Sequence, residues 1–330
     1  MKPWLWIPAS WAHAISPWGV SASAWLANSE ENSDLYNWKP FRWSGFHFRN
    51  PLGIAGGLDK NAEHIEDWQK LGAGFLEVGT ITPQPQESNP GQIINRDIEN
   101  LALWNRMGFP SRGADYVFDE IRFSNREVPL FINIGKNRST PADRALEDYL
   151  FLAEKFRSMA DVLVVNISSP NTQGLRDLAQ AHYLEPLLNG VVKVASYTPV
   201  LLKISPDMQD EDLKNLVRTA IDCGVLGFIM TNTTLERKVH SPFPAEGGVS
   251  GAPLSERSKV ALAKVQDFAG ADRSSLLLVN CGGVMTSEDV FDRLKRGADL
   301  VQVYSALVFQ GPRFLKEVAL QWKRQKDAQG

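Results

Sequence analysis

Residues 164–176 read V-V-N-I-S-S-P-N-T-Q-G-L-R and join a buried strand to a polar loop. The apolar run that starts after Asp161 ends at Asn166, and two Asn and two Ser side chains lie within six residues from that point, with Pro170 stiffening the turn. In parallel α/β enzymes, a strand that ends in such a loop presents side chains to a substrate. An ordinary polar turn explains the segment equally well when it is taken alone, but the rest of the chain repeats the arrangement.

Eight short apolar runs predict buried strands, at Leu52–Ala55, Phe75–Val78, Leu130–Ile134, Val162–Asn166, Val200–Ile204, Gly227–Thr231, Leu276–Asn280 and Leu300–Val303. Amphipathic segments follow them and predict helices, at Glu63–Leu71, Arg112–Asn125, Ala142–Met159, Tyr183–Ala195, Asp210–Cys223, Glu256–Phe268, Ser287–Arg296 and Pro312–Gln325. Strands that alternate with helices form a parallel sheet. Eight of them predict an α/β fold closed into a (β/α)8 TIM barrel rather than an open doubly wound sheet. The first strand is not followed by G-x-G-x-x-G, which argues against a dinucleotide-binding half.

The length, net charge and cysteine content of the chain exclude several classes of function. A chain of 330 residues fits one such barrel, typically about 250 residues, with an added element. The net charge of −3 provides no basic field, so we expect no nucleic-acid partner. Cys223 and Cys281 show neither metal-site spacing nor a disulfide framework, and we expect both to be reduced, buried thiols.

The added element is the N-terminal segment, residues 1–40, which we expect to precede a catalytic barrel at 41–330. Residues 1–27 are apolar and aromatic, and they predict two short helices at Ala9–Ile15 and Ser21–Leu26. Seven of the ten tryptophans lie near this end: Trp4, Trp6, Trp11, Trp18, Trp25, Trp38 and Trp43. Tryptophan with almost no charge favours a membrane interface, although a helical lid or a dimer contact would have a similar composition.

The same end of the chain lacks the marks of a spanning or exported segment. There is no run of about 18 apolar residues, and the features of a signal or transit peptide are missing. We therefore expect a peripheral protein on the cytoplasmic face of a bacterial-type cell membrane. Phe41–Phe48 predicts a hairpin that leads into the barrel.

The ends of the predicted strands carry Asn, Thr, Ser, Gly and Lys and almost no His or carboxylate. Zinc would require His or Cys, Mg²⁺ would require carboxylates, and a glycosidase would require paired acids, so we expect no metal and no glycosidase chemistry. Asn side chains both donate and accept, which suits a planar, amide-like ligand. The segments concerned are 56–61 (G-G-L-D-K-N), Gly79-Thr80, 104–109 (W-N-R-M-G-F), 133–137 (N-I-G-K-N), the segment 164–176, Lys203, 231–234 (T-N-T-T), 247–251 (G-G-V-S-G), 280–283 (N-C-G-G) and Tyr304-Ser305.

The late loops suit a phosphate, because TIM barrels often bind one there on backbone N–H groups. The residues are Gly248, Gly251, Gly282, Gly283, Tyr304 and Ser305. A phosphate, a large ring and two lysines, Lys60 and Lys203, together predict flavin mononucleotide, FMN. A lysine beside the N1/C2 edge would stabilise the anionic reduced ring, although both lysines are also compatible with ordinary solvent-facing positions. Ser169 is the leading candidate for a proton acceptor, and as a poor base it would need activation.

Taken together, these motifs resemble dihydroorotate dehydrogenases of class 2, the quinone-linked type, over nearly all of residues 50–315. The matching segments are N-P-L-G-I-A-G-G-L-D-K-N, E-V-G-T-I-T-P-Q-P-Q, N-R-M-G-F, N-I-G-K-N, V-N-I-S-S-P-N-T-Q-G-L-R, T-N-T-T, G-G-V-S-G-A-P-L and G-A-D-L-V-Q-V-Y-S-A-L. Ser169 indicates class 2, because class 1 enzymes carry a cysteine as base.

The resemblance implies that Ser169 takes the C5 proton of dihydroorotate while hydride leaves C6 for FMN, in pyrimidine (UMP) biosynthesis. It implies a substrate site at Lys60, Asn105, Arg106, Met107, Gly108, Phe109, Asn166, Asn171, Asn232 and Thr233. It implies FMN contacts at Gly56, Gly57, Leu58, Asp59, Lys60, Thr80, Asn133, Asn166, Lys203 and Thr231, and phosphate contacts at Gly251, Gly283, Tyr304 and Ser305.

For the acceptor side, the resemblance implies a membrane quinone that enters through the N-terminal extension, with His13 and Arg96 at its site, in a monomeric protein. One alternative is a related flavin dehydrogenase with a different electron acceptor or altered inhibitor sensitivity. Another is a non-catalytic, membrane-tethered flavin-binding protein. This last alternative predicts damage at Ser169 or Lys60, and both residues are present.

Overall fold

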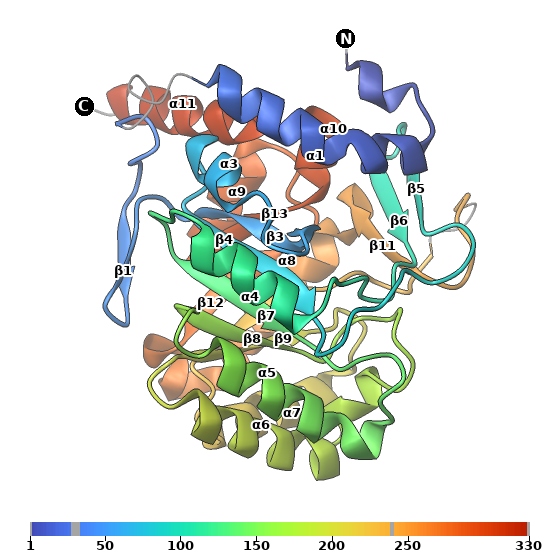
Figure 1. Ribbon diagram of the computed structural model, residues 1–330. Coiled ribbons are helices and arrows are strands. Elements are labelled where there is room, and N and C mark those ends of the chain that lie inside the picture. The colour runs from blue at the N-terminus through green and yellow to red at the C-terminus, as the bar shows by residue number, and fades with distance from the viewer. Residues whose placement is uncertain (1, 28–33, 238–240, 329–330) are drawn as a thin grey trace.

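Eight parallel strands close into a barrel in the computed structural model, which describes residues 2–27, 34–237 and 241–328 (Figure 1). The strand order around the barrel is β10-β12-β13-β3-β4-β7-β8-β9. The strands are β3 Leu52–Asp59, β4 Phe75–Ile81, β7 Leu130–Ile134, β8 Val162–Asn166, β9 Val200–Ile204, β10 Gly227–Met230, β12 Leu277–Cys281 and β13 Leu300–Val303. The predicted TIM barrel is confirmed, and the predicted segments 1–40 and 41–330 each include a few residues outside the described ranges.

Helices cover the outside of the barrel, and all eight predicted ones form. They are α3 Ile65–Lys70, α4 Ala114–Phe123, α5 Ala145–Phe156, α6 Ala181–Ala195, α7 Asp210–Asp222, α8 Ser255–Ala269, α9 Ser287–Lys295 and α11 Arg313–Asp327. A short helix that was not predicted, α10 Ser305–Gln310, follows the last strand. Short 3-10 helices lie at Pro3–Leu5, Ala142–Arg144, Arg176–Ala179, Ala252–Leu254 and Gly270–Ser275. The apolar face of each helix packs on the strands, as its periodicity predicts.

A small antiparallel sheet at the rim of the barrel was not predicted. Its order is β11-β6-β5, with β5 Ile94–Asp97, β6 Ala102–Asn105 and β11 Gly248–Gly251. Gly248 pairs with Asn105, so the sheet joins the long loop after β4 to the loop after β10. Each strand is only four residues long, and although β5 and β6 pair locally, β11 pairs with β6 across about 145 residues of chain, so local periodicity could not reveal the sheet.

The N-terminal segment forms one helix, α1 Ala9–Leu26, so the prediction of two short helices is wrong. Pro17 lies inside α1 and has no N–H for the carbonyl of His13. The hydroxyl of Ser16 donates to that carbonyl at 2.8 Å instead, and the helix continues through the proline. In Figure 1, α1 crosses the barrel beside α3 and β5. No described helix combines the length and the apolar character needed to cross a bilayer.

The hairpin β1 Phe41–Trp43 and β2 Phe46–Phe48 forms as predicted and closes the N-terminal end of the barrel. Phe48 is fully buried, and its ring meets the rings of Phe75 and Phe131 edge-on at 5.9 and 6.2 Å between centroids. These three rings form an aromatic plug. Together with Val162 and Leu201 they make the interior of the barrel apolar at this end. The polar-lined cavity of the barrel lies at the opposite, carboxyl end of the strands.

We expect Phe48→Ala to lower the free energy of unfolding by about 3–5 kcal/mol, because it leaves a cavity between two buried rings. Denaturant titration measures the change. His47→Ala, on the exposed face of the same strand, is the matched control and should change stability little. Equal losses in the two variants would contradict the role of Phe48 as the plug.

Candidate active site

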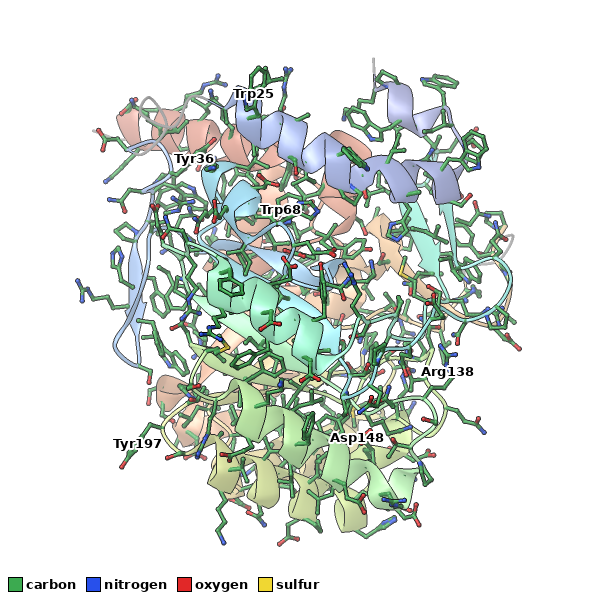
Figure 2. All side chains as sticks on the ribbon, in the orientation of Figure 1. Trp25, Tyr36, Trp68, Arg138, Asp148 and Tyr197 are labelled. Atoms are coloured by element: carbon green, nitrogen blue, oxygen red, sulfur yellow. The ribbon has the colours of Figure 1, made fainter. Side chains whose placement is uncertain are left out.

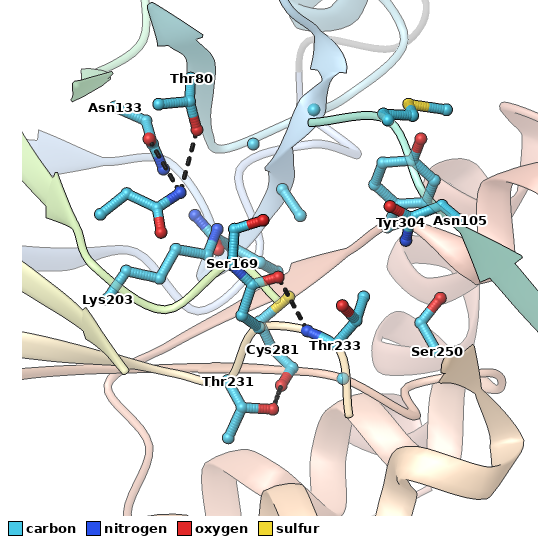
Figure 3. Close-up of a pocket in the computed structure, with 18 of the residues that line it drawn as sticks. Thr80, Asn105, Asn133, Ser169, Lys203, Thr231, Thr233, Ser250, Cys281 and Tyr304 are labelled. Atoms are coloured by element: carbon cyan, nitrogen blue, oxygen red, sulfur yellow. Dashed lines mark hydrogen bonds between the residues drawn. The ribbon is translucent and has the colours of Figure 1, made fainter. Parts of the chain in front are cut away.

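One cavity at the carboxyl ends of the strands collects most of the predicted site residues (Figure 3). Side chains reach it from β3, β4, β6, β7, β8, β9, β12 and β13 and from the loops that follow them. The predicted residues that line it are Gly56, Gly57, Lys60, Thr80, Asn105, Met107, Gly108, Phe109, Asn133, Asn166, Ser169, Asn171, Lys203, Thr231, Asn232, Thr233, Gly283, Tyr304 and Ser305.

Of the residues that the resemblance implies for the substrate and for FMN, four do not line this cavity. Asp59 points into the start of α3, where its carboxylate accepts the N–H groups of Glu63 and His64, both at 2.9 Å. Arg106 turns outward to Glu246. Leu58 lines a second cavity, and Gly251 pairs with Ala102 in the rim sheet.

Ser169 lies at the centre of a polar loop. It is buried, and its Oγ accepts the backbone N–H of Asn171 at 3.2 Å. The side-chain amide of Asn171 donates to Oδ1 of Asn105 at 2.9 Å, which joins the loop after β8 to the end of β6. The rim sheet thereby brings Asn105 to the serine from a segment more than 60 residues away in the chain.

A second set of amides is linked through Asn166. Its Nδ2 donates to Thr80 Oγ1 at 2.9 Å and to Asn133 Oδ1 at 3.2 Å (Figure 3). Its Oδ1 accepts the hydroxyl of Ser168 at 3.0 Å, and Asn232 donates to the same hydroxyl oxygen at 3.1 Å. Four strand ends are thus connected by side-chain hydrogen bonds, which fixes the direction in which each amide faces the cavity.

Several buried polar atoms at the cavity have no hydrogen-bond partner among the described residues. Asn171 Oδ1, Thr233 Oγ1 and Gln302 Oε1 all belong to residues that line the cavity. Buried polar atoms are ordinarily paired in folded proteins. Their concentration at one cavity indicates that a polar ligand completes the site.

Two lysines supply the positive charge of the site, the half-buried Lys60 and the buried Lys203. Burial lowers the pKa of Lys60 to about 8, against the attraction of Asp59 and Glu63, so Lys60 is mainly cationic at neutral pH. Burial raises the pKa of Asp59 to about 6. Lys203 Nζ lies 2.7 Å from an oxygen of Glu77, a residue that the sequence analysis missed. A carboxylate inside the apolar run F-L-E-V of β4 was the available signal, because buried carboxylates need partners.

The glycine-rich end of the cavity is built by close packing of backbone. Gly283 has a φ of +68°, and a Cβ there would lie 2.1 Å from the Cα of Ser255. The hydroxyls of Ser250 and Ser305 are 3.0 Å apart at the start of α10. Hydroxyls and backbone N–H groups without a competing carboxylate in this lining suit an anionic group such as a phosphate.

A second cavity, of about 350 Å³, lies beneath α1. The two residues of the predicted quinone site, His13 and Arg96, both line it. Burial, followed by the charge of Lys60, lowers the pKa of His13 to about 4, so this imidazole is neutral at neutral pH. Arg96 donates to the carbonyls of Trp4, at 2.7 Å, and Ile7, which ties the N-terminus to β5. Tyr304 lines both cavities and forms the wall between them.

The loop that carries Ser169 is fastened by Arg176. Its guanidinium donates to the carbonyl of Ser168 at 3.0 Å, to Asp207 at 3.0 Å and to the carbonyl of Thr233 at 3.2 Å. These partners follow β8, β9 and β10. One side chain therefore holds three adjacent loops of the site together.

Comparisons with known proteins agree with this geometry. Residues 41–324 match the family model described as dihydroorotate dehydrogenase. A dihydroorotate dehydrogenase (quinone) of a Sulfurovum species is 41% identical over 83% of this chain and 77% of its own length, and that of Pseudoalteromonas atlantica is 38% identical over 94% and 95%. A crystal structure of DHODH in complex with ferulenol from Eimeria tenella is 30% identical, with a TM-score of 0.86 over 97% of this chain and 92% of that one.

We expect Arg176→Gln to loosen the loop of Ser169, because the shorter neutral side chain cannot bridge three partners. Hydrogen exchange at the amides of Ser168 and Leu175 should become roughly tenfold faster or more. Arg144→Gln breaks an exposed ion pair with Glu147 and should leave these amides unchanged. Unaltered exchange in Arg176→Gln would show that the loop holds its conformation without this contact.

Proposed function

The chain belongs to the dihydroorotate dehydrogenase family, and from this membership we propose that it oxidises dihydroorotate to orotate in pyrimidine biosynthesis and passes the electrons to a quinone. The observation that carries the proposal is the position of Ser169, which shares one cavity with Lys60 and with the amides of Asn105 and Asn171. The cavity thereby combines a proton acceptor, a cation for a carboxylate and amides for a pyrimidine ring.

We propose FMN as the flavin of this site. The unpartnered polar atoms, the buried Lys203 and the hydroxyl- and glycine-lined end near Ser305 fit a ring with an attached phosphate. The residues that would hold the ring are Gly56, Gly57, Lys60, Thr80, Asn133, Asn166, Lys203 and Thr231, and those that would hold the phosphate are Gly283, Tyr304 and Ser305. FMN, when bound, supplies an acceptor for the hydride from C6 of the substrate and a donor of electrons to the second acceptor.

The pyrimidine would bind between Lys60 and the amides. Lys60, cationic at neutral pH, pairs with the substrate carboxylate. Asn171 Oδ1 and Thr233 Oγ1 lack partners among the described residues and are free to pair with the ring N–H and C=O groups. The substrate is thereby held with its reacting edge toward Ser169.

Ser169 would remove the proton from C5. The N–H of Asn171 donates to its Oγ and holds the hydroxyl in place. A serine hydroxyl is a weak base, so as its oxygen accepts the proton from C5 it would pass its own proton to a water molecule bound in the cavity. The burial of Ser169 excludes bulk water from the transfer.

On the acceptor side, we propose that residues 1–40 form an extension that admits a quinone, attached to the catalytic barrel at 41–330. The cavity beneath α1 is lined largely by apolar side chains, including Leu58, Ile94 and Leu307. Tyr304 separates it from the proposed flavin site. An apolar quinone ring in this cavity would lie one side chain away from the flavin.

The outer face of α1 supports a membrane surface as the partner of this extension. Trp11, Trp18 and Trp25 recur every seven residues, so they share one face of the helix, and they are 70%, 80% and 84% exposed. Figure 2 shows Trp25 pointing away from the barrel. Neither Lys, Arg, Asp nor Glu occurs between Ala9 and Leu26. The indole ring suits the boundary between headgroups and acyl chains.

Anaerobic mixing with dihydroorotate tests the reaction. The flavin absorbance of the purified protein should bleach on mixing and return when a soluble quinone is added, but not when fumarate is added. In Ser169→Ala, bleaching should slow by roughly a hundredfold or more while orotate still binds, because general base catalysis is lost. A yellow protein that dihydroorotate fails to bleach would overturn the substrate, and bleaching that quinone fails to reverse would overturn the acceptor.

Vesicle co-sedimentation tests the membrane partner. The triple variant Trp11→Gln, Trp18→Gln, Trp25→Gln should bind phosphatidylcholine vesicles roughly tenfold more weakly or worse, because insertion depends on buried apolar area. Raising the salt concentration should change binding of the unaltered protein little, since the face carries no charge. A matched control is Phe123→Gln, which removes an exposed aromatic ring from α4. Equal binding of the triple variant and the unaltered protein would exclude this face as the anchor.

A further inference from the structure

Glu77 is a carboxylate buried inside the barrel, near the middle of β4. Its Oε1 accepts hydrogen bonds from Lys203 Nζ, at 2.7 Å, and from Asn133 Nδ2. Its Oε2 accepts from Gln302 Nε2 at 2.6 Å. These donors belong to β9, β7 and β13, so one carboxylate joins side chains from four strands.

All three donors line the cavity proposed for FMN, whereas Glu77 itself does not. Because a carboxylate only accepts, it determines which end of each amide faces it. The NH₂ group of Asn133 turns to Glu77, which leaves Oδ1 for the amide of Asn166. The NH₂ group of Gln302 also donates to Glu77. The other end of this amide, Gln302 Oε1, has no partner among the described residues.

Glu77 is also the counter-ion of Lys203. Both side chains are at least nine-tenths buried, and within the described residues the ammonium donates to Glu77 alone. Removing one partner of a buried ion pair leaves a charge that is costly to keep. The carboxylate therefore allows Lys203 to carry its charge at the floor of the cavity.

The lack of a side chain at Gly56, in strand β3, provides room for the carboxylate of Glu77. A Cβ at Gly56 would lie 2.4 Å from Glu77 Oε1 and 2.9 Å from Cδ. Any side chain at position 56 would have to displace the carboxylate from the oxygen position that Lys203 and Asn133 share. Gly56 thus contributes to the site because it has no side chain that would contact the Glu77 carboxylate.

We propose that Glu77 is a positioning residue that keeps Lys203 charged and in place beneath the flavin, so that the protein binds the reduced ring in preference to the oxidised one. The reduced ring carries the additional negative charge, and a fixed cation beside it stabilises that charge. The inference rests on the proposed FMN site and assigns a function to a residue that does not touch the flavin.

The test is the midpoint potential of bound flavin in Glu77→Gln, which keeps the shape and removes the charge. Without its counter-ion, Lys203 gives up its charge or its position, and the reduced ring loses its partner. We expect the reduced form to bind at least tenfold more weakly relative to the oxidised form, a fall of about 30 mV for a two-electron couple. In a Lys203→Met background, the same substitution should shift the potential little, because Glu77 acts through the lysine.

Two further variants separate this role from other effects. Glu66→Gln makes the same change of net charge on α3 and should leave the potential unchanged. Gly56→Ala keeps the charge but displaces the carboxylate, and it should lower the potential even if Glu77→Gln folds poorly. A potential that stays constant or rises in Glu77→Gln, or a shift that persists in Lys203→Met, would overturn the inference. If the unaltered protein binds no flavin, the FMN proposal itself fails.

Discussion

Closure of the eight-stranded sheet is the constraint on which the site depends. Parallel strands all end on the same side, and closure places those ends in one ring, so residues as distant as Lys60 and Ser305 line a single cavity. The aromatic plug at Phe48 closes the other end. With one end filled and apolar, the polar side chains that face a ligand lie toward the carboxyl end. The closed barrel therefore determines where the active site lies, and the individual residues determine which reaction it can perform.

Inside this ring, orientation matters as much as proximity. Asparagine amides can face a ligand with either end, and a hydrogen-bond network beginning at an acceptor-only carboxylate removes the choice. From Glu77 through Asn133 to Asn166, each amide has one direction that satisfies its neighbour. The same carboxylate balances the charge of Lys203. Arg176 plays the corresponding part for the loops, because it joins three of them through one planar group.

The N-terminal helix adds a second cavity rather than altering the first. Its inner face closes over Leu58 and Arg96, and a polar contact from Ser21 to Asp67, at 2.6 Å, fastens it to α3. Its outer face carries the row of tryptophans. Tyr304, shared by both cavities, is the point where the two halves of the proposed reaction meet. A helix with two apolar faces suits a position between a protein and a second apolar phase.

The amino-acid sequence by itself determined the barrel and most of its cavity. Buried strands and amphipathic helices repeat with distinct periods, and polar residues at strand ends stand out because each follows an apolar run. Tertiary structure decided the rest. It turned Arg106 outward to Glu246 and Asp59 into the start of α3, and it paired the rim strands β5, β6 and β11. It continued α1 through Pro17 by a bond from Ser16, and it surrounded Glu77 with donors. These outcomes depend on partners that are far apart in the chain or on competition between alternative hydrogen bonds, and periodicity carries no information about either.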